Sequence, residues 1–472
     1  MKNYVATEWI ETGETIEVIN PFNGEVIDTV PKCGVGEVDR ALESAARGAA
    51  VMAKLSGYER YEILKKAADL LAEGSEEFAR TITLEEGKIL AESRGEVGRG
   101  IQTLTLSAEE AKRLHGETVP FDGAPATSGK IGFTLRVPCG IVVAISPFNF
   151  PLNLVCHKVG PALAAGNAVV VKPATDTPLS ALKLTELMLK AGLPPEGIQC
   201  LTGPGGKVGE ALCADPRVRK ITFTGSRDVG ERICQVGALK KITMELGSNA
   251  PIIVMPDADM EKVAAAVVST GYANAGQVCI STQRVLVSDP IYSDFLDTTK
   301  VKVEALATGD PLDRSTHVGP MVREPDAVRV AELIQEAVSG GARLVTGGER
   351  SGAIYAPTIV ADVDPDMRVS RDELFGPAVA VTRVNDIDEA IVLANDSRYG
   401  LAAGIFTENV EWAMKFAREV ESGNLHINYG PQWRVDLMPY GGLKESGFGK
   451  EGPRYAVEEM TELKTVVFHL SS

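Results

Sequence analysis

The sequence predicts an α/β protein built on parallel sheets that are covered on both faces. Short continuous apolar runs, typical of buried strands, occur at 141–145, 168–171, 221–223 and 252–254. Amphipathic helical patterns occur at 63–71, before these runs, and at 263–270, after them. Buried strands that alternate with helices form βαβ units, so these two observations together indicate the fold class. The sequence shows no internal repeat and no low-complexity linker.

Polar segments follow three of the strand-like runs. Ser146-Pro-Phe-Asn149 follows 141–145, Lys172-Pro-Ala-Thr175 follows 168–171, and Gly225-Ser226 follows 221–224. In open parallel sheets, ligands bind beyond the carboxyl ends of the strands. We therefore expect a single ligand site at this edge. The glycine-rich segment 203–209 predicts a strand-to-helix turn, and the GxGxxG string at 447–452 predicts only a turn, because no strand-like run precedes it.

Size, charge and cysteine content exclude several classes of protein. The 472 residues leave room for about three domains or two large ones. A net charge of −16 argues against general affinity for nucleic acid or an anionic membrane. The most apolar stretch, 159–171, is too short to span a bilayer, and the polar N-terminus does not resemble a signal peptide. Seven cysteines without metal-like spacing favour a cytoplasmic protein that binds no metal.

Cys279 is the candidate nucleophile. A lone cysteine is more often structural than catalytic, so the groups available to assist it matter. Attack on a carbonyl needs a donor for the oxyanion, and the side-chain amide of Asn149 at a strand end is suited to that role. Glu245, which precedes the strand-like run 252–254, is suited to act as a general base toward water.

Eight segments carry a family resemblance when they are taken in chain order. They are SPFNFPL (146–152), KPAT (172–175), FTGS (223–226), ELGSNAP (245–251), GQVC (276–279), ELFGP (373–377), NDSRYGLAAGIFT (395–407) and MPYGGLKESGFG (438–449). With them the chain resembles the aldehyde dehydrogenase superfamily over nearly its whole length. The stretch 432–452 resembles the branch that holds lactaldehyde, phosphonoacetaldehyde and non-phosphorylating glyceraldehyde-3-phosphate dehydrogenases.

The resemblance implies oxidation of an aldehyde to its carboxylic acid. Cys279 would attack the aldehyde to give a thiohemiacetal, with Asn149 and the backbone N–H of Cys279 forming the oxyanion hole. Hydride transfer would leave a thioester, which is hydrolysed with Glu245 as base. A CoA-acylating dehydrogenase is one alternative, although such relatives lack the carboxylate of Glu245. A non-catalytic structural or binding protein on this fold is the other, although Cys279, Glu245, Asn149 and Lys172 are all present.

The resemblance also implies a site for NAD or NADP. Lys172 matches the residue that binds the adenosine ribose, and Glu373 matches the carboxylate at the nicotinamide ribose. Thr175 stands where many NAD-preferring relatives carry an acid, which permits NADP, whereas Asp176 would favour NAD, so the preference stays open. The full set is Ser146, Pro147, Phe148, Lys172, Thr175, Gly205, Gly225, Ser226, Leu246, Glu373 and Phe375.

Five residues are candidate substrate contacts. Phe150 and Tyr440 match aromatic wall positions, and Val278 precedes the nucleophile without the charge found there in anion-selective relatives. His157, eight residues after Asn149, is expected on the same helix face, either as a substrate contact or as a core histidine bonded to the backbone. Arg434 is expected either to clamp an anion or to pair with Asp436.

The substrate implied is a small polar or anionic aldehyde. Lactaldehyde is the leading candidate. An anionic aldehyde held by Arg434, such as phosphonoacetaldehyde, glyceraldehyde 3-phosphate or a semialdehyde, is the alternative.

The resemblance further implies the domain organisation. Residues 1–115 and 138–247 would form a Rossmann-like nucleotide-binding domain, and 248–448 an α/β catalytic domain. Residues 116–137 and 449–472 would form a small β oligomerisation element. The apolar strand-like segment 465–468 would leave an exposed edge in a monomer, so a homodimer or homotetramer is expected.

Overall fold

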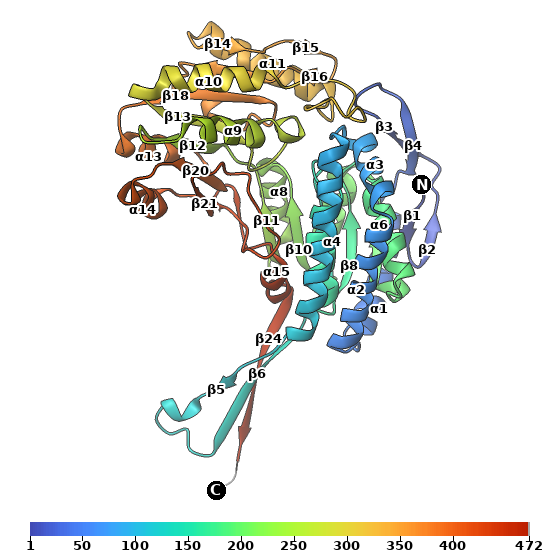
Figure 1. Cartoon of the computed structure of the whole chain (residues 1–472). Coiled ribbons are helices and arrows are strands. Elements are labelled where there is room, and N and C mark those ends of the chain that lie inside the picture. The colour runs from blue at the N-terminus through green and yellow to red at the C-terminus, as the bar shows by residue number, and fades with distance from the viewer. Residues whose placement is uncertain (471–472) are drawn as a thin grey trace.

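The computed structural model describes residues 1–470, which form two large sheets side by side and a projecting arm (Figure 1). The predicted α/β class is confirmed, because most neighbouring strands in both large sheets run parallel. Part of the predicted oligomerisation element, residues 471–472, lies outside the described residues.

The first sheet has the strand order β2-β1-β9-β8-β7-β10-β11-β23. Its parallel strands are β7 (Ile141–Ile145), β8 (Ala168–Lys172), β9 (Ile198–Cys200), β10 (Val218–Thr224) and β11 (Lys241–Glu245). Antiparallel strands β1 (Asn3–Val5), β2 (Glu8–Ile10) and β23 (Gly447–Phe448) form its edges. Every residue of β7 and β8 is buried, which explains why both strands are continuous apolar runs.

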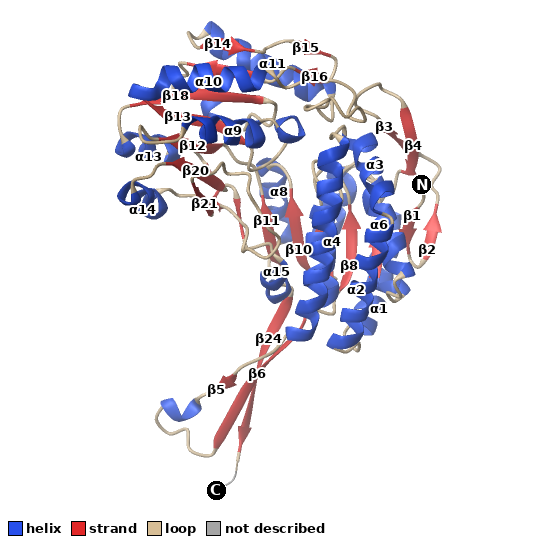
Figure 2. Cartoon of the chain, in the orientation of Figure 1, coloured by secondary structure: helices blue, strands red, loops and turns tan. Residues whose placement is uncertain are grey.

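Helices cover both faces of this sheet. Val142, Ala144, Val169 and Val171 pack toward α2 (Gly57–Glu73), α4 (Leu90–Arg113), α5 (Asn153–Ala164) and α6 (Leu179–Lys190). Val143, Ile145 and Val170 point the other way, toward α1 (Val35–Met52), α7 (Glu210–Ala214) and α8 (Arg227–Gly237). Figure 2 shows α2, α4 and α6 in front of the strands. α3 (Ser75–Glu86) packs beside α4.

The second sheet has the order β14-β17-β18-β13-β12-β20-β21. It contains β12 (Ala250–Val254), β13 (Thr282–Ser288), β14 (Arg343–Thr346), β17 (Thr358–Ala361), β18 (Ala378–Val384), β20 (Ala402–Phe406) and β21 (Asn424–Ile427). α9 (Met260–Gly271), α10 (Tyr292–Glu304) and α11 (Glu324–Ser339) share a core on one face. α13 (Ile387–Asn395) and α14 (Val410–Glu419) share a core on the other.

The arm is a three-stranded antiparallel sheet that projects from the body (Figure 1). β6 (Lys130–Pro138) pairs along its length with β24 (Thr461–His469), and the short β5 (Thr118–Val119) joins it. The predicted boundary at 449 needs correction, because α15 (Pro453–Glu459) packs against α4 and α5. Its side chains Ala456 and Val457 are buried there, so only the segment from 461 onward belongs to the arm.

Small elements complete the described chain. Short strand pairs are β3 (Thr15–Ile19) with β4 (Val26–Pro31), β15 (Arg350–Ser351) with β16 (Ile354–Tyr355), and β19 (Tyr399–Gly400) with β22 (Leu443–Lys444). Short helical turns are Phe121–Gly123, Pro195–Gly197, Gly205–Gly209, Ala273–Gly276, Asp289–Ile291 and α12 (Arg368–Arg371). Within residues 1–470, no helix has the length and apolar character needed to cross a bilayer.

Candidate active site

Cys279 lies between two cavities that meet at the thiol. One cavity has a volume of about 740 Å³ and the other about 210 Å³, and Cys279 lines both. The large cavity is built mainly on the carboxyl ends of β7, β8, β10 and β11, as expected for an open parallel sheet. The thiol therefore stands where a large ligand from one side and a small ligand from the other would meet.

An unusual backbone turn positions Cys279. Asn274, Ala275 and Gly276 have φ values of 51°, 51° and 69°, all in the left-handed region. A Cβ on Gly276 would lie 2.0 Å from the carbonyl oxygen of Gly376, so only glycine fits there. Acidic residues at the junction of α3 and α4 hold the turn. The backbone N–H of Asn274 donates to Glu92 at 3.0 Å, and its side-chain amide donates to Glu86 at 2.9 Å.

Asn149 lies in the loop between β7 and α5. Its Nδ2 donates to the carbonyl oxygen of Gln277 at 2.8 Å, which places the amide beside the turn that carries Cys279. The backbone carbonyl oxygen of Asn149 accepts a hydrogen bond from Nζ of Lys88 at 2.7 Å, and Lys88 forms a buried ion pair with Glu96 at 2.6 Å. Sequence reasoning missed Lys88 and Glu96, which hold this loop against α4.

Glu245 ends β11 and is buried beside the site. Neither of its carboxyl oxygens has a hydrogen-bond partner among the described residues. Burial raises the pKa of this carboxyl well above its ordinary value, and the nearby negative charge of Glu451 raises it further. The cations Arg434 and Lys158 oppose this effect. Glu245 thus has the free oxygens and the perturbed pKa of a proton-transfer group.

All eleven residues predicted for the cofactor line the large cavity. Lys172 is buried, its Nζ donates to the carbonyl of Pro173 at 2.9 Å, and burial lowers its pKa to about 8. Burial raises the pKa of the Glu373 carboxyl to about 7, and this group accepts from the backbone N–H of Ser248 at 2.8 Å.

The large cavity has the groups that a dinucleotide needs. Gly205 and Gly206 leave open space where a Cβ would stand. Ser226 stands at the N-cap position of α8, and the N-terminal N–H groups of this helix favour a phosphate. The hydroxyl of Ser146 is buried with no hydrogen-bond partner among residues 1–470. These residues therefore fit a nucleotide cofactor with hydroxyl groups at both ends and phosphates between them.

The small cavity is lined by Phe150, Val278, Arg434 and Tyr440 of the predicted substrate residues, but not by His157. The structure adds a stripe from α4 that sequence reasoning missed, formed by Glu92, Gly95, Glu96 and Arg99. Their spacing of three and four residues puts them on one helix face, and that periodicity is the signal that would have found them. Gln432 also lines this cavity, and its Oε1 is buried without a partner in the described part of the chain.

Two expectations for His157, its helix face and its backbone hydrogen bond, are wrong. Helix α5 begins at Asn153, so Asn149 lies outside it and the two residues do not share a helix face. Nε2 of His157 lies 2.8 Å from Oδ1 of Asp436, which is a side-chain rather than a backbone contact. Burial lowers the pKa of His157 to about 4, with a smaller effect from Arg434, so the ring is neutral and donates to Asp436.

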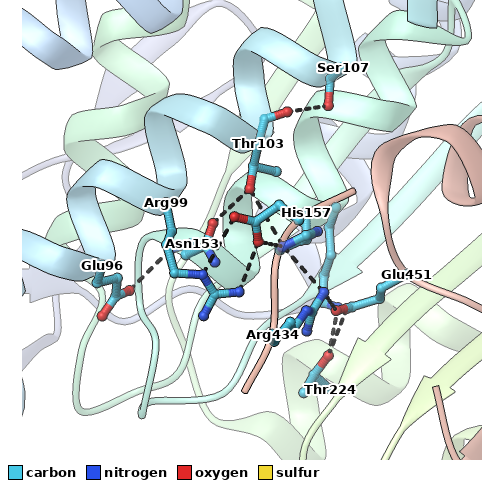
Figure 3. Close-up of polar contacts among 11 residues, drawn as sticks. Glu96, Arg99, Thr103, Ser107, Asn153, His157, Thr224, Arg434 and Glu451 are labelled. Atoms are coloured by element: carbon cyan, nitrogen blue, oxygen red, sulfur yellow. Dashed lines mark hydrogen bonds and ion pairs between the residues drawn. The ribbon is translucent and has the colours of Figure 1, made fainter. Parts of the chain in front are cut away.

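The predicted pairing of Arg434 with Asp436 is also wrong. Nη2 of Arg434 lies 3.0 Å from Glu451 (Figure 3). Glu451 also binds Lys158 at 2.9 Å. The Asp436 carboxylate instead forms an ion pair with Arg99 at 2.8 Å and a hydrogen bond with His157. The tertiary structure thus gathers three cations, Lys158, Arg99 and Arg434, around the two carboxylates of Glu451 and Asp436. Arg99 and Arg434 line the small cavity together with Lys88, Glu92 and Glu96.

A thiol between a large cavity that fits a dinucleotide and a small cavity with charged and apolar side chains is typical of dehydrogenases that act on small carbonyl compounds. Residues 9–466 match the aldehyde dehydrogenase family. The chain belongs to this family and is an NAD(P)-dependent aldehyde dehydrogenase.

Relatives with known names are similar over nearly their whole length. The 3-sulfolactaldehyde dehydrogenase of Priestia aryabhattai is 51% identical over 467 residues, which are 99% of this chain and 98% of the relative. The lactaldehyde dehydrogenase of Methanococcus vannielii is 40% identical over 470 residues, 99% of each chain. The glyceraldehyde-3-phosphate dehydrogenase of Methanocaldococcus jannaschii, solved with NADP, is 37% identical with a TM-score of 0.94, over 97% of this chain and 100% of that one.

Proposed function

We propose that this enzyme oxidises a short hydroxyaldehyde with one anionic group, and that 3-sulfolactaldehyde is its leading substrate. The observation that carries the proposal is the small cavity that joins Cys279 to Arg434 and Arg99. Its volume of about 210 Å³ suits a three-carbon aldehyde. The relative that is 51% identical bears the name of that activity, which supports the same choice.

The free hydrogen-bond donors of the two arginines in the cavity support an anion. Arg434 is almost fully buried, and its Nε has no hydrogen-bond partner in the described residues. Arg99 keeps 31% of its side chain exposed while it binds Asp436. Both guanidinium groups therefore retain donors for a sulfonate or carboxylate. The apolar Val278 beside the nucleophile is consistent with a single rather than a double negative charge.

Lactaldehyde is the second candidate. Relatives that are about 40% identical bear that name, and lactaldehyde lacks the anionic group but would occupy the same cavity. Polar groups such as Gln432 would then hold its hydroxyl group. The two candidates differ in whether the arginine charges contribute to binding.

The roles proposed for the catalytic residues follow from their placement. The Cys279 thiolate forms a bond to the aldehyde carbon, and the amide of Asn149 stabilises the resulting oxyanion. A bound nicotinamide cofactor supplies the hydride acceptor, for which the eleven residues of the large cavity are the proposed binding set. Glu245, once ionised, removes a proton from the water that attacks the thioester, which releases the acid and the free thiolate. The carboxyl of Glu245 favours this hydrolysis over transfer to coenzyme A.

The substrate proposal is tested with a matched set of aldehydes and arginine variants. We would measure kcat/KM for 3-sulfolactaldehyde, lactaldehyde and propanal without coenzyme A, in wild type, Arg99→Met and Arg434→Met. Arg94→Met is the control, because Arg94 lies on the exposed side of α4 and pairs with Glu76.

We expect wild type to have a higher kcat/KM for 3-sulfolactaldehyde than for lactaldehyde. In both test variants the ratio of these two values should fall about tenfold, which is the equivalent of one charge-assisted contact. Equal kcat/KM for the sulfonate and lactaldehyde in wild type would contradict the proposal and favour lactaldehyde.

We further propose that the arm joins copies of this chain into a homodimer or homotetramer. Its strands expose the apolar side chains Ile131, Leu135, Leu463, Val467 and Phe468. An apolar sheet with a free edge favours pairing with another sheet. Analytical ultracentrifugation of wild type and Leu463→Asp tests this, and a monomeric wild type would overturn it.

The seven free cysteines support our proposal of a cytoplasmic location.

A further inference from the structure

The hydroxyl of Tyr440 touches the nucleophile. Its oxygen lies 3.3 Å from Sγ of Cys279, and the described structure gives this hydroxyl no other hydrogen-bond partner. The ring is buried, with 2% of the residue exposed. Two backbone hydrogen bonds with Glu451, of 3.1 and 2.7 Å, fix the position of Tyr440. The fold therefore fixes the backbone of Tyr440 and places its hydroxyl at the sulfur.

The direction of this hydrogen bond depends on the state of the sulfur. A thiol and a phenol can each donate to the other, but a thiolate has no proton and can only accept. Burial raises the pKa of Tyr440 well above its ordinary value, so the phenol keeps its proton. When Cys279 loses its proton to water, the Tyr440 hydroxyl is thus a donor to the negative sulfur.

Arg434 lies on the face of the same ring. Its guanidinium carbon is 3.8 Å from the ring centroid of Tyr440, and its ion pair with Glu451 holds it there. A cation on the face of a phenol draws electron density from the ring and polarises the O–H bond toward donation. Burial raises the pKa of the Cys279 thiol to about 12, and the carboxyls of Glu245 and Glu373 raise it further. The hydrogen bond from Tyr440 and the positive charge of Arg434 both lower this pKa, which favours the thiolate.

We propose that Tyr440 is a further catalytic residue: its hydroxyl donates a hydrogen bond to the Cys279 thiolate and stabilises the reactive form of the nucleophile, and Arg434 strengthens that bond from the face of the ring. Phenylalanine would fill the same space but cannot donate. Tyr440 therefore does more than form an aromatic wall. The proposal concerns the free nucleophile, so it holds whichever aldehyde the enzyme oxidises.

Alkylation of the free enzyme tests the proposal without any substrate. Iodoacetamide reacts with the thiolate, so its rate at Cys279 from pH 6 to 10 reports the ionisation of that thiol. The alkylated peptides would be quantified by mass spectrometry in wild type and Tyr440→Phe. Cys234 is the internal reference, because it is half-buried and its pKa is raised by burial and by Glu231 rather than by Tyr440. Tyr292→Phe is the control, because its hydroxyl binds the backbone N–H of Asp362 at 2.8 Å beneath the second sheet.

We expect Tyr440→Phe to slow alkylation of Cys279 about tenfold at every pH in this range, since a thiol pKa higher by one unit gives a tenfold smaller fraction of thiolate. Cys234 and the Tyr292→Phe enzyme should match wild type. An unchanged rate of Cys279 alkylation in Tyr440→Phe would overturn the proposal. Thermal melting of both variants shows whether they are folded.

Discussion

The guanidinium of Arg323 holds the carboxylate of Asp176 through two contacts at the large cavity, with Nε 3.0 Å from Oδ1. Asp176 follows Thr175, the position at which an acid would favour NAD. Because the positive charge of Arg323 compensates the negative charge of Asp176, the large cavity has no free carboxylate at this position. Arg323 also brings a cation to the cavity, which favours a phosphate on the ribose. The geometry thus permits NADP alongside NAD.

The first prediction is that Arg323→Gln shifts cofactor preference toward NAD. The change frees the Asp176 carboxylate and removes a cation, and both effects disfavour the extra phosphate of NADP. We expect the ratio of kcat/KM for NADP to that for NAD to fall about tenfold, as for loss of one charge-assisted contact. Arg343→Gln is the control, since it breaks an exposed Arg–Asp pair with Asp362. An unchanged ratio would show that the pair does not influence the choice.

The second prediction concerns the pH dependence of thioester hydrolysis. Glu245 must lose its proton to act as base, so hydrolysis should accelerate as pH rises. Burial and the charge of Glu451 both raise the pKa of Glu245. Glu451→Gln removes that charge and should move the pH profile of the hydrolysis rate down by about one unit. Rapid-quench kinetics would measure it, with Glu462→Gln on the arm as control. A shift toward higher pH would refute the assignment of Glu245.

The third prediction is that His157 makes the fold sensitive to acid. Its pKa is about 4 in the folded protein against an ordinary value of 6.5, so the unfolded chain binds the extra proton between these values. The free energy of unfolding therefore keeps its full value above about pH 6.5 and falls by up to about 3 kcal/mol as the pH falls toward 4. His157→Gln should reduce the loss measured by urea unfolding at about pH 7 and about pH 4.5. The exposed His115→Gln should behave as wild type, and an equal loss in both variants would argue against a neutral buried His157.

The fourth prediction is that Gly276→Ala displaces the nucleophile. Gly276 combines a φ of +69° with a Cβ position 2.0 Å from a carbonyl oxygen, so alanine forces the Cys279 turn to move. We expect activity to fall at least about a hundredfold, because an ångström of misplacement costs that much. Gly13→Ala, which meets nothing within 4 Å, is the control. Fluorescence titration should show that NADP still binds, since the first sheet is unchanged. Near-normal activity would contradict the role given to this turn.

The sequence by itself determined where the buried strands lie, and it determined that the residues expected to bind the ligand follow their carboxyl ends. The apolar run 141–145 is strand β7, and the run 168–171 lies within β8 (Ala168–Lys172), because a strand buried on both faces has no polar position to interrupt it. The residues Ser146 and Lys172 therefore reach one cavity for a local reason, the end of a parallel strand. The turn at 203–209 was predictable in the same way, since its glycines are local signals.

Only the tertiary structure decided the partners of the buried charges. Arg99 meets Asp436 across 337 positions of the chain, and His157 meets the same carboxylate across 279. Arg434 and Asp436 are close in the sequence, which suggested an ion pair between them. In the structure, the packing of α4 and α5 places Arg99 and His157 against the Asp436 carboxylate, and Arg434 pairs with Glu451 instead. Such pairings depend on which helices pack together, and the energy of a buried charge depends on every neighbour at once. For that reason Cys279 can be proposed as the nucleophile from the sequence, whereas the groups that tune its thiol are brought together only by the fold.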